Sequence, residues 1–307
     1  MIANRIAYGE TLIELAKERE DIVVLDADAG KSTGVLPFLK VFPDRYIQCG
    51  IAEQNMVGIA AGLAACGLCP FLATFAVFTS MRAVEQVRNS VCYSNLNVKV
   101  TGTHAGLETG GDGGTHQAVE DIAIMRALPG MRVLTPSTPN ATRKLTRLAA
   151  EKHGPFYIRL GKDPAPEFYG EEELFPLGGS KELRSGAEAA ILSCGNMLSR
   201  VIEAADLLEK EGIHARVLDM YSVKPIDREA IVRAAHETQG LVTVEDHVTI
   251  GGLGGAVAEI LTQYAPAKLT RVGLEDTFGR SGIPLELYKL FGLTPEAIAE
   301  AVRELLK

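Results

Sequence analysis

Short apolar runs alternate with longer segments of helical pattern along most of the chain, and this alternation limits the possible folds more than any other feature. Unbroken apolar runs are typical of strands that are covered on both faces, as in parallel sheets. In the first half we expect strands at 22–28, 69–75, 97–103 and 131–137. The helices expected between them lie at about 52–66, 79–91 and 117–127. This order predicts an α/β fold with mainly parallel sheets.

The same alternation returns in the second half of the 307-residue chain. Between the halves, segment 169–186 is rich in Gly and acidic residues and contains Pro, and we interpret it as a linker. Beyond it we expect strands at 189–195, 215–225, 241–247 and 269–276. The expected helices lie at about 198–211, 227–236, 255–264 and 294–306. The sequence therefore predicts two doubly wound domains, 1–168 and 187–307.

The charge balance excludes some classes of partner. The net charge of −8 argues against nucleic acid, because a phosphate backbone requires a basic face. No apolar stretch is long enough to span a bilayer, so we expect no membrane partner. The five cysteines are odd in number and lack disulfide-framework spacing, which indicates a reducing, cytoplasmic compartment. Cys66 and Cys69 form a C-x-x-C without a second ligand pair, so we interpret them as structural.

The helix expected at 52–66 carries an unusual charge. It is apolar on nearly all sides, which predicts a buried helix. Glu53 nevertheless lies in its first turn, and a buried carboxylate is costly unless another group pairs with it. Glu53 is therefore a candidate functional residue.

The segment 101–121, TGTHAGLETGGDGGTHQAVED, is the most unusual loop of the chain. It lies between an expected strand and an expected helix, where ligand sites of parallel sheets gather. His104, Asp112 and His116 fall close together on a glycine-rich backbone, and glycines permit close approach of a ligand. Their spacing fits no common metal site, so we predict a ligand-binding loop without a metal.

Several stretches together resemble the transketolase family: GIAEQNM, ATFAVF, THAGLETGGDGGTHQ, LPGMRVLTPS, and VKPID followed by LVTVEDHVTIGGLGGAVAE. The resemblance is to the C-terminal part of a transketolase, that is, the pyrimidine-binding domain and the C-terminal domain. It implies a thiamine diphosphate-dependent transferase of pentose phosphate metabolism. Such an enzyme moves a two-carbon ketol unit from a ketose phosphate to an aldose phosphate.

The resemblance also implies roles around the cofactor. Glu53 matches the family glutamate that hydrogen-bonds N1′ of the aminopyrimidine ring. Phe75 and Phe78 match the aromatic residues that pack on this ring, and Asp28 matches an acid close to the cofactor. His116 matches a residue near the reacting carbons, suited to hydrogen-bonding the donor carbonyl.

A second set of positions matches groups that read the sugar phosphate. Asp112 matches the residue that reads a sugar hydroxyl. The far phosphate is implied to lie against His104, Arg159, Arg5 and Ser32. An Arg suits this anion because its planar guanidinium group can donate hydrogen bonds to two oxygens at once. Together with Glu53 and His116, His104 completes the implied catalytic set.

The sequence lacks a pyrophosphate and metal motif. The GDG at 111–113 and Asn140 have a similar spacing, but that motif requires its GDG directly after a strand, and a long loop intervenes here. We therefore expect no metal ligand in this chain. The resemblance implies a split transketolase, in which an N-terminal pyrophosphate-binding subunit holds Mg²⁺ and two copies of each subunit assemble.

Three alternatives stay open at the level of sequence. The beta subunit of a 2-oxoacid dehydrogenase has the same domain pair, and 1-deoxyxylulose-5-phosphate synthase shares the IAEQ and THQ stretches. A regulatory or scaffolding subunit could keep the fold without the chemistry. Glu53 argues against a scaffold, which has no use for an acid in that helix.

Overall fold

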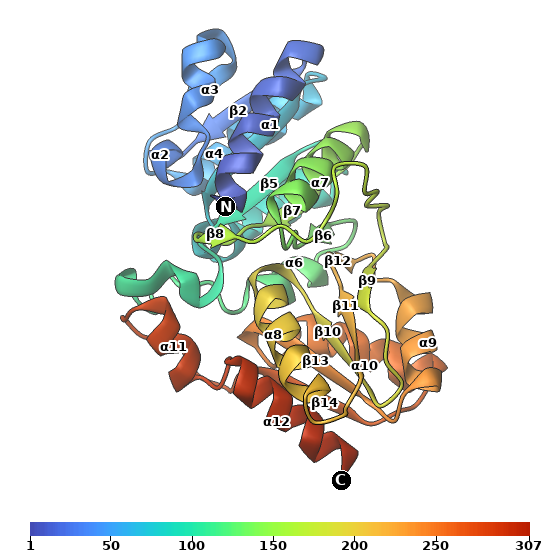
Figure 1. Cartoon of the computed structure of the whole chain (residues 1–307). Helices are drawn as coiled ribbons and strands as arrows, with labels where there is room; N and C mark the ends of the chain where they lie inside the picture. Colours follow the sequence, from blue (N-terminus) through green and yellow to red (C-terminus); the bar gives the residue numbers. More distant parts are fainter.

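The computed structural model describes residues 1–307 and contains two main sheets, one in each half of the chain (Figure 1). The first sheet has the strand order β12-β6-β7-β5-β4-β2-β3. Its parallel strands are β2 (Ile22–Asp26), β3 (Tyr46–Gln48), β4 (Cys69–Phe75), β5 (Lys99–Thr103), β6 (Arg132–Leu134) and β7 (Phe156–Arg159). Strands β2 and β5 are buried along their whole length, as expected of parallel strands that are covered on both faces.

Helices cover both faces of this sheet. One face packs against α1 (Asn4–Glu18), α3 (Leu36–Val41) and α7 (Pro139–Glu151), and the short α2 (Gly30–Thr33) lies beside them. The opposite face packs against α4 (Glu53–Ala65), α5 (Val84–Gln86) with its flanking π-helical turns, and α6 (Asp121–Ala127). The side chains of β2 alternate between these two layers, so each face of the strand has its own core.

The second sheet has the strand order β14-β13-β10-β11-β9. Its strands are β9 (Lys181–Arg184), β10 (Ala189–Ser193), β11 (Ala215–Asp219), β13 (Leu241–Val248) and β14 (Leu269–Leu274), of which only β9 is antiparallel to its neighbour. One face packs against α8 (Leu198–Glu209) and α12 (Pro295–Leu306). The other face packs against α9 (Arg228–Glu237) and α10 (Leu253–Tyr264), and its core continues into that of α4 and α6.

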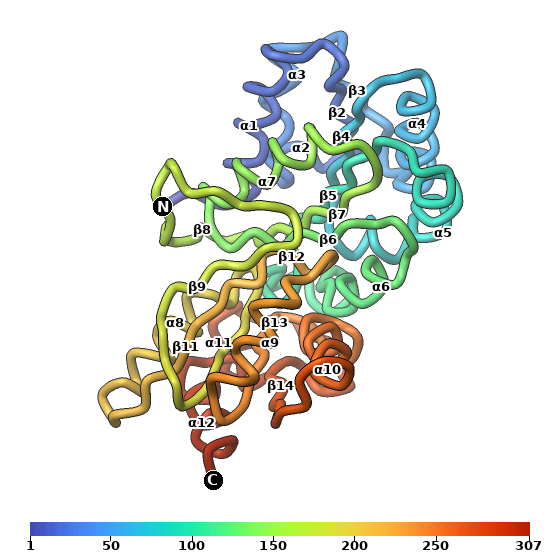
Figure 2. Tube along the Cα trace, turned by 90° about the vertical axis from the view of Figure 1, so that its right-hand side faces the viewer, coloured from blue at the N-terminus to red at the C-terminus, as the bar shows by residue number.

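The mainly parallel α/β architecture confirms the predicted fold class. The single strand expected at 215–225 is wrong in detail, because it forms two strands in different sheets. Its first part is β11, and its second part, β12 (Ser222–Lys224), pairs with β6 of the first sheet. Within segment 169–186, β9 pairs with β11. The turned view in Figure 2 shows the chain passing from β11 in the second sheet to β12 in the first.

Two short pairings lie outside the two main sheets, and the second of them brings the halves of the chain into contact. Strand β1 (Ile2–Ala3) pairs with β8 (Pro164–Ala165), which precedes the second sheet. Helix α11 (Pro284–Leu290), coloured red in Figure 1, packs against the 3-10 turn Gly106–Asp112. The sequence did not lead us to expect α11, β3, β7 or α7. No helix is both long enough and apolar enough to serve as a membrane span.

Candidate active site

The predicted site residues gather where adjacent parallel strands end. Strands β3, β2, β4, β5 and β7 are neighbours in the first sheet and run in the same direction, so their carboxyl ends share one edge. Ligand sites of open parallel sheets form at this edge. The last residue of β4 is Phe75, and the segments that follow these strands supply Glu53, Asp28, Ser32, Phe78 and His104.

Four rings form a continuous group at this edge, here called the aromatic cluster: Phe75, Phe78, His104 and His116. The rings of Phe75 and Phe78 are parallel within 5°, with centroids 5.8 Å apart. The imidazole of His104 stacks on Phe75 with centroids 4.1 Å apart, and His116 meets Phe78 edge-on at 5.4 Å. Both phenylalanines are only partly buried, so the cluster offers apolar ring surface to a ligand.

Arg82 is the partner of the buried carboxylate. Its Nη1 donates to Oε1 of Glu53 at 2.9 Å, and the Glu53 side chain is only 4% exposed. The same guanidinium lies over the ring of Phe78, with Cζ 4.3 Å from the centroid. Sequence reasoning did not predict this contact, because it joins two segments 29 residues apart.

His104 is held in an unusual conformation. Its backbone φ is 56°, a left-handed value that is uncommon for residues other than glycine, and its side chain is buried. Burial lowers the pKa of His104 to about 3, and the nearby positive charges of Arg5 and Lys162 act in the same direction. His104 is therefore neutral at physiological pH and offers a hydrogen bond rather than a charge.

Arg5, Ser32 and Lys162 lie together beside His104. Nε of Arg5 donates to the backbone oxygen of Lys162 at 3.1 Å, and its Nη1 donates to that of Ser32 at 2.9 Å. Nζ of Lys162 donates to the backbone oxygen of Thr109 at 3.3 Å. Sequence reasoning missed Lys162, although its position just beyond the end of β7 was a usable signal, because side chains that follow a strand reach the ligand edge.

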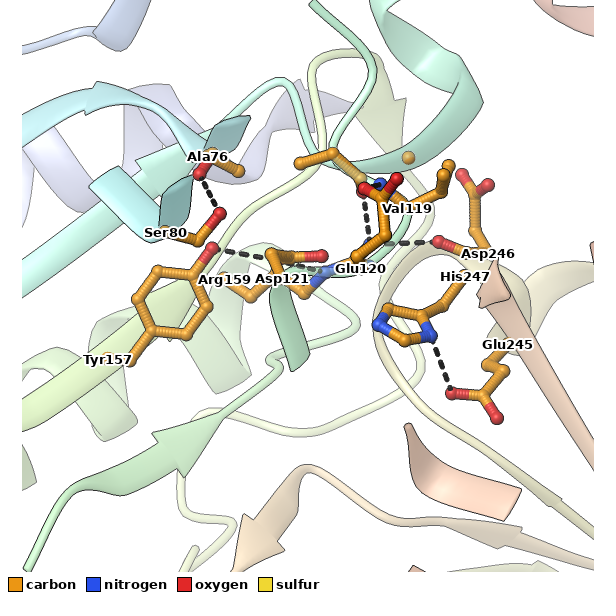
Figure 3. A network of polar contacts seen from close by, with 12 residues as sticks. Ala76, Ser80, Val119, Glu120, Asp121, Tyr157, Arg159, Glu245, Asp246 and His247 are labelled. Atoms are coloured by element: carbon orange, nitrogen blue, oxygen red, sulfur yellow. Dashed lines mark hydrogen bonds and ion pairs between the residues drawn. The ribbon is translucent and has the colours of Figure 1, made fainter. Parts of the chain in front are cut away.

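The structure does not bring Arg159 to this group. Arg159 lies within β7, is 4% exposed, and its Nε donates to Asp121 Oδ2 at 2.8 Å. Its Nη2 donates to the backbone oxygens of Ala118 and Asp246, so it links the two halves of the chain (Figure 3). The family resemblance implied that Arg159 contacts the far phosphate of the substrate. In the structure, Lys162 is instead the cation beside Arg5 and His104.

Asp121, Tyr157, Arg159 and Asp246 form a second polar group, here called the interdomain network. The hydroxyl of Tyr157 donates to Asp121 Oδ2 at 2.7 Å (Figure 3). Asp246 accepts hydrogen bonds from the backbone N–H of Leu107 and from the hydroxyl of Tyr288 at 2.8 Å. All four members are buried. The network therefore fixes the start of the 106–117 loop to the second sheet.

The glycines of the 106–117 loop make room for the second half of the chain. A Cβ at Gly106 would lie 2.2 Å from Oδ2 of Asp246, and one at Gly113 would lie 2.3 Å from Oγ of Ser281. Both residues also have positive φ. Next to them, Nε2 of Gln117 donates to the backbone oxygen of Arg280 at 2.9 Å. At these two positions the close neighbour is thus the second domain, whereas the sequence suggested a ligand.

The remaining predicted residues lie at the rim of this edge. Asp28, with φ of 61°, and Asp112 are exposed, and His116 is partly buried with its Nδ1 2.9 Å from Oγ1 of Thr115. Ser32 is exposed as well. No group of three or more His, Cys, Asp or Glu side chains is placed to hold a metal ion.

Comparison with protein-family models assigns both halves of the chain. Residues 1–166 match the model "Transketolase, pyrimidine binding domain", and residues 178–298 match "Transketolase, C-terminal domain". A transketolase C-terminal section of Methanocaldococcus jannaschii is 45% identical, over 99% of this chain and 96% of that protein. A 6-deoxy-6-sulfo-D-fructose transketolase subunit of a Clostridium species is 42% identical, over 98% and 93%.

One longer relative and two solved structures are transketolases as well. Human transketolase is 39% identical over 99% of this chain, but the chain spans only 49% of the human protein. A solved structure described as a split gene transketolase, inactive beta4 tetramer, superposes with a TM-score of 0.91 at 47% identity, covering 99% of this chain and 98% of that one. Transketolase from Pichia stipitis gives a TM-score of 0.85 at 26% identity, covering 99% of this chain and 46% of that one.

Proposed function

The chain belongs to the transketolase family, and we propose that it is the C-terminal subunit of a split, thiamine diphosphate-dependent transketolase. Its reaction is the transfer of a two-carbon ketol unit from a ketose phosphate to an aldose phosphate. The observation that carries the proposal is the juxtaposition of a buried carboxylate, Glu53, with the stacked rings of Phe75 and Phe78. An acid beside a flat apolar platform suits a heteroaromatic ring that carries a basic nitrogen.

The residues present fit the aminopyrimidine half of the cofactor. Glu53 is 4% exposed and accepts a hydrogen bond only from Arg82, so the carboxylate keeps capacity for a ring nitrogen. Phe75 and Phe78 would pack on the ring, and Asp28 would lie at its rim. The bound cofactor supplies the carbanion chemistry, whereas the protein supplies position and proton exchange.

The substrate anion is proposed to bind beside His104. Arg5 and Lys162 bring two positive charges to one place, and the exposed Ser32 lies with them. His104 adds a neutral ring nitrogen, because burial keeps its pKa at about 3. His116 and Asp112 lie closer to the solvent side, where they would hydrogen-bond the donor carbonyl and a sugar hydroxyl.

The nature of the anion is left broad in this proposal. Relatives of similar length include a 6-deoxy-6-sulfo-D-fructose transketolase subunit and, at 39% identity, an apulose-4-phosphate transketolase subunit. Two cations and a neutral donor recognise a terminal phosphate or sulfonate through the same oxygens. The shared chemistry is therefore a ketose with a terminal tetrahedral anion.

The missing half of the enzyme is proposed to be a separate subunit. The chain spans 49% of human transketolase, and it has no group of three or more His, Cys, Asp or Glu side chains placed to hold a metal ion. An N-terminal subunit would hold the pyrophosphate and Mg²⁺, and two copies of each subunit would form the enzyme in the cytoplasm. The beta4 tetramer described as inactive for a 47% identical chain supports dependence on a partner.

Reconstitution tests this proposal. The chain is mixed with the pyrophosphate-binding subunit from the same genome, thiamine diphosphate and Mg²⁺, and ketose phosphate donors or pyruvate are supplied. The proposal predicts turnover with a ketose donor and an aldose phosphate acceptor. Turnover with pyruvate as the donor, together with an aldose phosphate or an oxidising acceptor, would instead assign a synthase or dehydrogenase, and inactivity with every donor would favour the scaffold.

A further inference from the structure

Arg82 is the one charged group of the chain that contacts the buried carboxylate of Glu53, and nothing in the proposed function uses it. Its Nη1 lies 2.9 Å from Oε1, while the Arg82 side chain itself is 48% exposed. The pair is therefore asymmetric: the acid is buried in the site, and its counter-ion reaches it from the solvent side. Losing the counter-ion would leave an unpaired buried charge.

The guanidinium of Arg82 also fixes the platform on which the cofactor ring is proposed to lie. Its Cζ is 4.3 Å from the centroid of Phe78, so one planar group touches both the acid and the ring. The backbone supports this arrangement, because Phe78–Arg82 forms a π-helical turn that brings residues four apart to nearly the same side. Nε2 of Gln54, next to Glu53, donates to the backbone oxygen of Arg82 at 3.0 Å.

We propose that Arg82 is a positioning residue of the active site: it neutralises Glu53 before the cofactor binds and sets its place relative to Phe78. The inference rests on the proposed function. Glu53 accepts no other hydrogen bond within the chain, so its second oxygen stays available to the aminopyrimidine nitrogen. A lysine cannot replace Arg82 fully, because an ammonium lacks the planar surface that stacks on a ring while its edge binds a carboxylate.

The first test measures the reconstituted enzyme. Arg82→Gln is expected to raise the thiamine diphosphate concentration for half-maximal activity by about tenfold or more, and to lower kcat, because the acid is misplaced relative to the ring. Arg82→Lys should recover part of both losses. The matched control is Arg88→Gln, since Arg88 is exposed on the following turn and bonds only its neighbour Asn89. Equal behaviour of Arg82→Gln and Arg88→Gln would overturn the proposal.

The second test separates positioning from a purely structural role. Thermal melts of the subunit alone, without cofactor, are recorded for Glu53→Gln, Arg82→Gln and the double variant. Arg82→Gln should lower the melting temperature clearly in the natural background and much less beside Glu53→Gln, because a neutral amide requires no counter-ion. A structural role alone would give this melting pattern while saturating cofactor restored the full kcat, and that combination contradicts positioning. If the unsubstituted pair of subunits binds no thiamine diphosphate, the proposed function fails instead.

Discussion

The aromatic cluster and the interdomain network both adjoin the 106–117 loop, and they differ in how far their members are buried and hydrogen-bonded within the chain. Asp121, Tyr157, Arg159 and Asp246 are buried and bonded to one another or to backbone. Phe75, Phe78 and His116 are partly exposed, and Arg82 points to solvent beside them. The first group is hydrogen-bonded within one chain except at Oδ1 of Asp121, which has no partner, whereas the second group presents partly exposed ring surface to the ligand of the proposed function.

This difference gives the two halves of the chain separate tasks. In the proposed function the carboxyl edge of the first sheet supplies the chemistry, and the second half fixes the 106–117 loop that carries His116. Substitutions in the aromatic cluster should therefore change activity with little effect on folding. Substitutions in the interdomain network should first lower the free energy of unfolding.

The largest expected effect is on catalysis. Glu53→Gln should lower kcat of the reconstituted enzyme by about 10³-fold, because a positioned acid contributes on this scale and the amide cannot exchange a proton. Assembly with the partner, followed by size-exclusion chromatography, should be unchanged. If the variant kept activity within tenfold of the natural enzyme, Glu53 would not be the acid that exchanges this proton.

Arg159→Gln tests the interdomain network. It leaves Asp121 buried without its cation, so the free energy of unfolding should fall by about 3–5 kcal/mol. Urea titration of the subunit alone measures this loss. Lys162→Gln serves as the control, because the Lys162 side chain bonds only the backbone oxygen of Thr109 and its replacement should leave stability nearly unchanged. Similar stability of the Arg159→Gln variant and the natural chain would show that the ion pair adds nothing.

Glu108 links stability to pH. Burial raises its pKa to about 7, and the nearby carboxylate of Asp246 acts in the same direction. The folded chain thus holds this proton more tightly than the unfolded chain does. The resulting stabilisation is complete below about pH 4.5 and is lost as pH rises through about 7, on the order of 3 kcal/mol in total.

Glu108→Gln should flatten this decline in the free energy of unfolding between about pH 5 and pH 8, measured by urea titration. An unchanged slope would contradict the raised pKa.

The smallest effect is expected at the anion site. Lys162→Gln should raise KM for a ketose phosphate about tenfold with kcat within twofold, because one charge-assisted contact to the substrate is lost. Initial-rate measurements at saturating cofactor test this. A donor of the same length without the terminal anion is the matched control, and its KM should not respond. If the substitution raised KM equally for both donors, Lys162 would not be a contact of the terminal anion.

The sequence predicted the fold well where apolar runs were long and failed where they were short or charged. Strands β4 and β10 lie almost where their apolar runs indicated. The run at β7 was not recognised as a strand because it ends in Arg159, whose charge is neutralised only by Asp121 from another element. Strand β12 has three residues, and its pairing with β6 depends on the tertiary fold.

The site was predictable in its residue types but not in its contacts. The family pattern identified Glu53, Phe75, Phe78, His104 and His116, and the structure brings the four rings together. Arg82 was missed because its contact with Glu53 joins distant segments, and Lys162 was missed because β7, the strand that precedes it, was not predicted. The glycine-rich loop suggested a ligand as its close neighbour, but at Gly106 and Gly113 the neighbour is the second domain, because a sequence does not show which group comes close.

The central claim is that the open edge of the first sheet becomes an active site only with a partner subunit and thiamine diphosphate. The most direct measurement is transfer of a ketol unit from a ketose phosphate by this chain alone and by the chain with the pyrophosphate-binding subunit, both with Mg²⁺ and cofactor. We predict no turnover for the chain alone and full turnover for the pair. Full turnover by the chain alone would contradict the account.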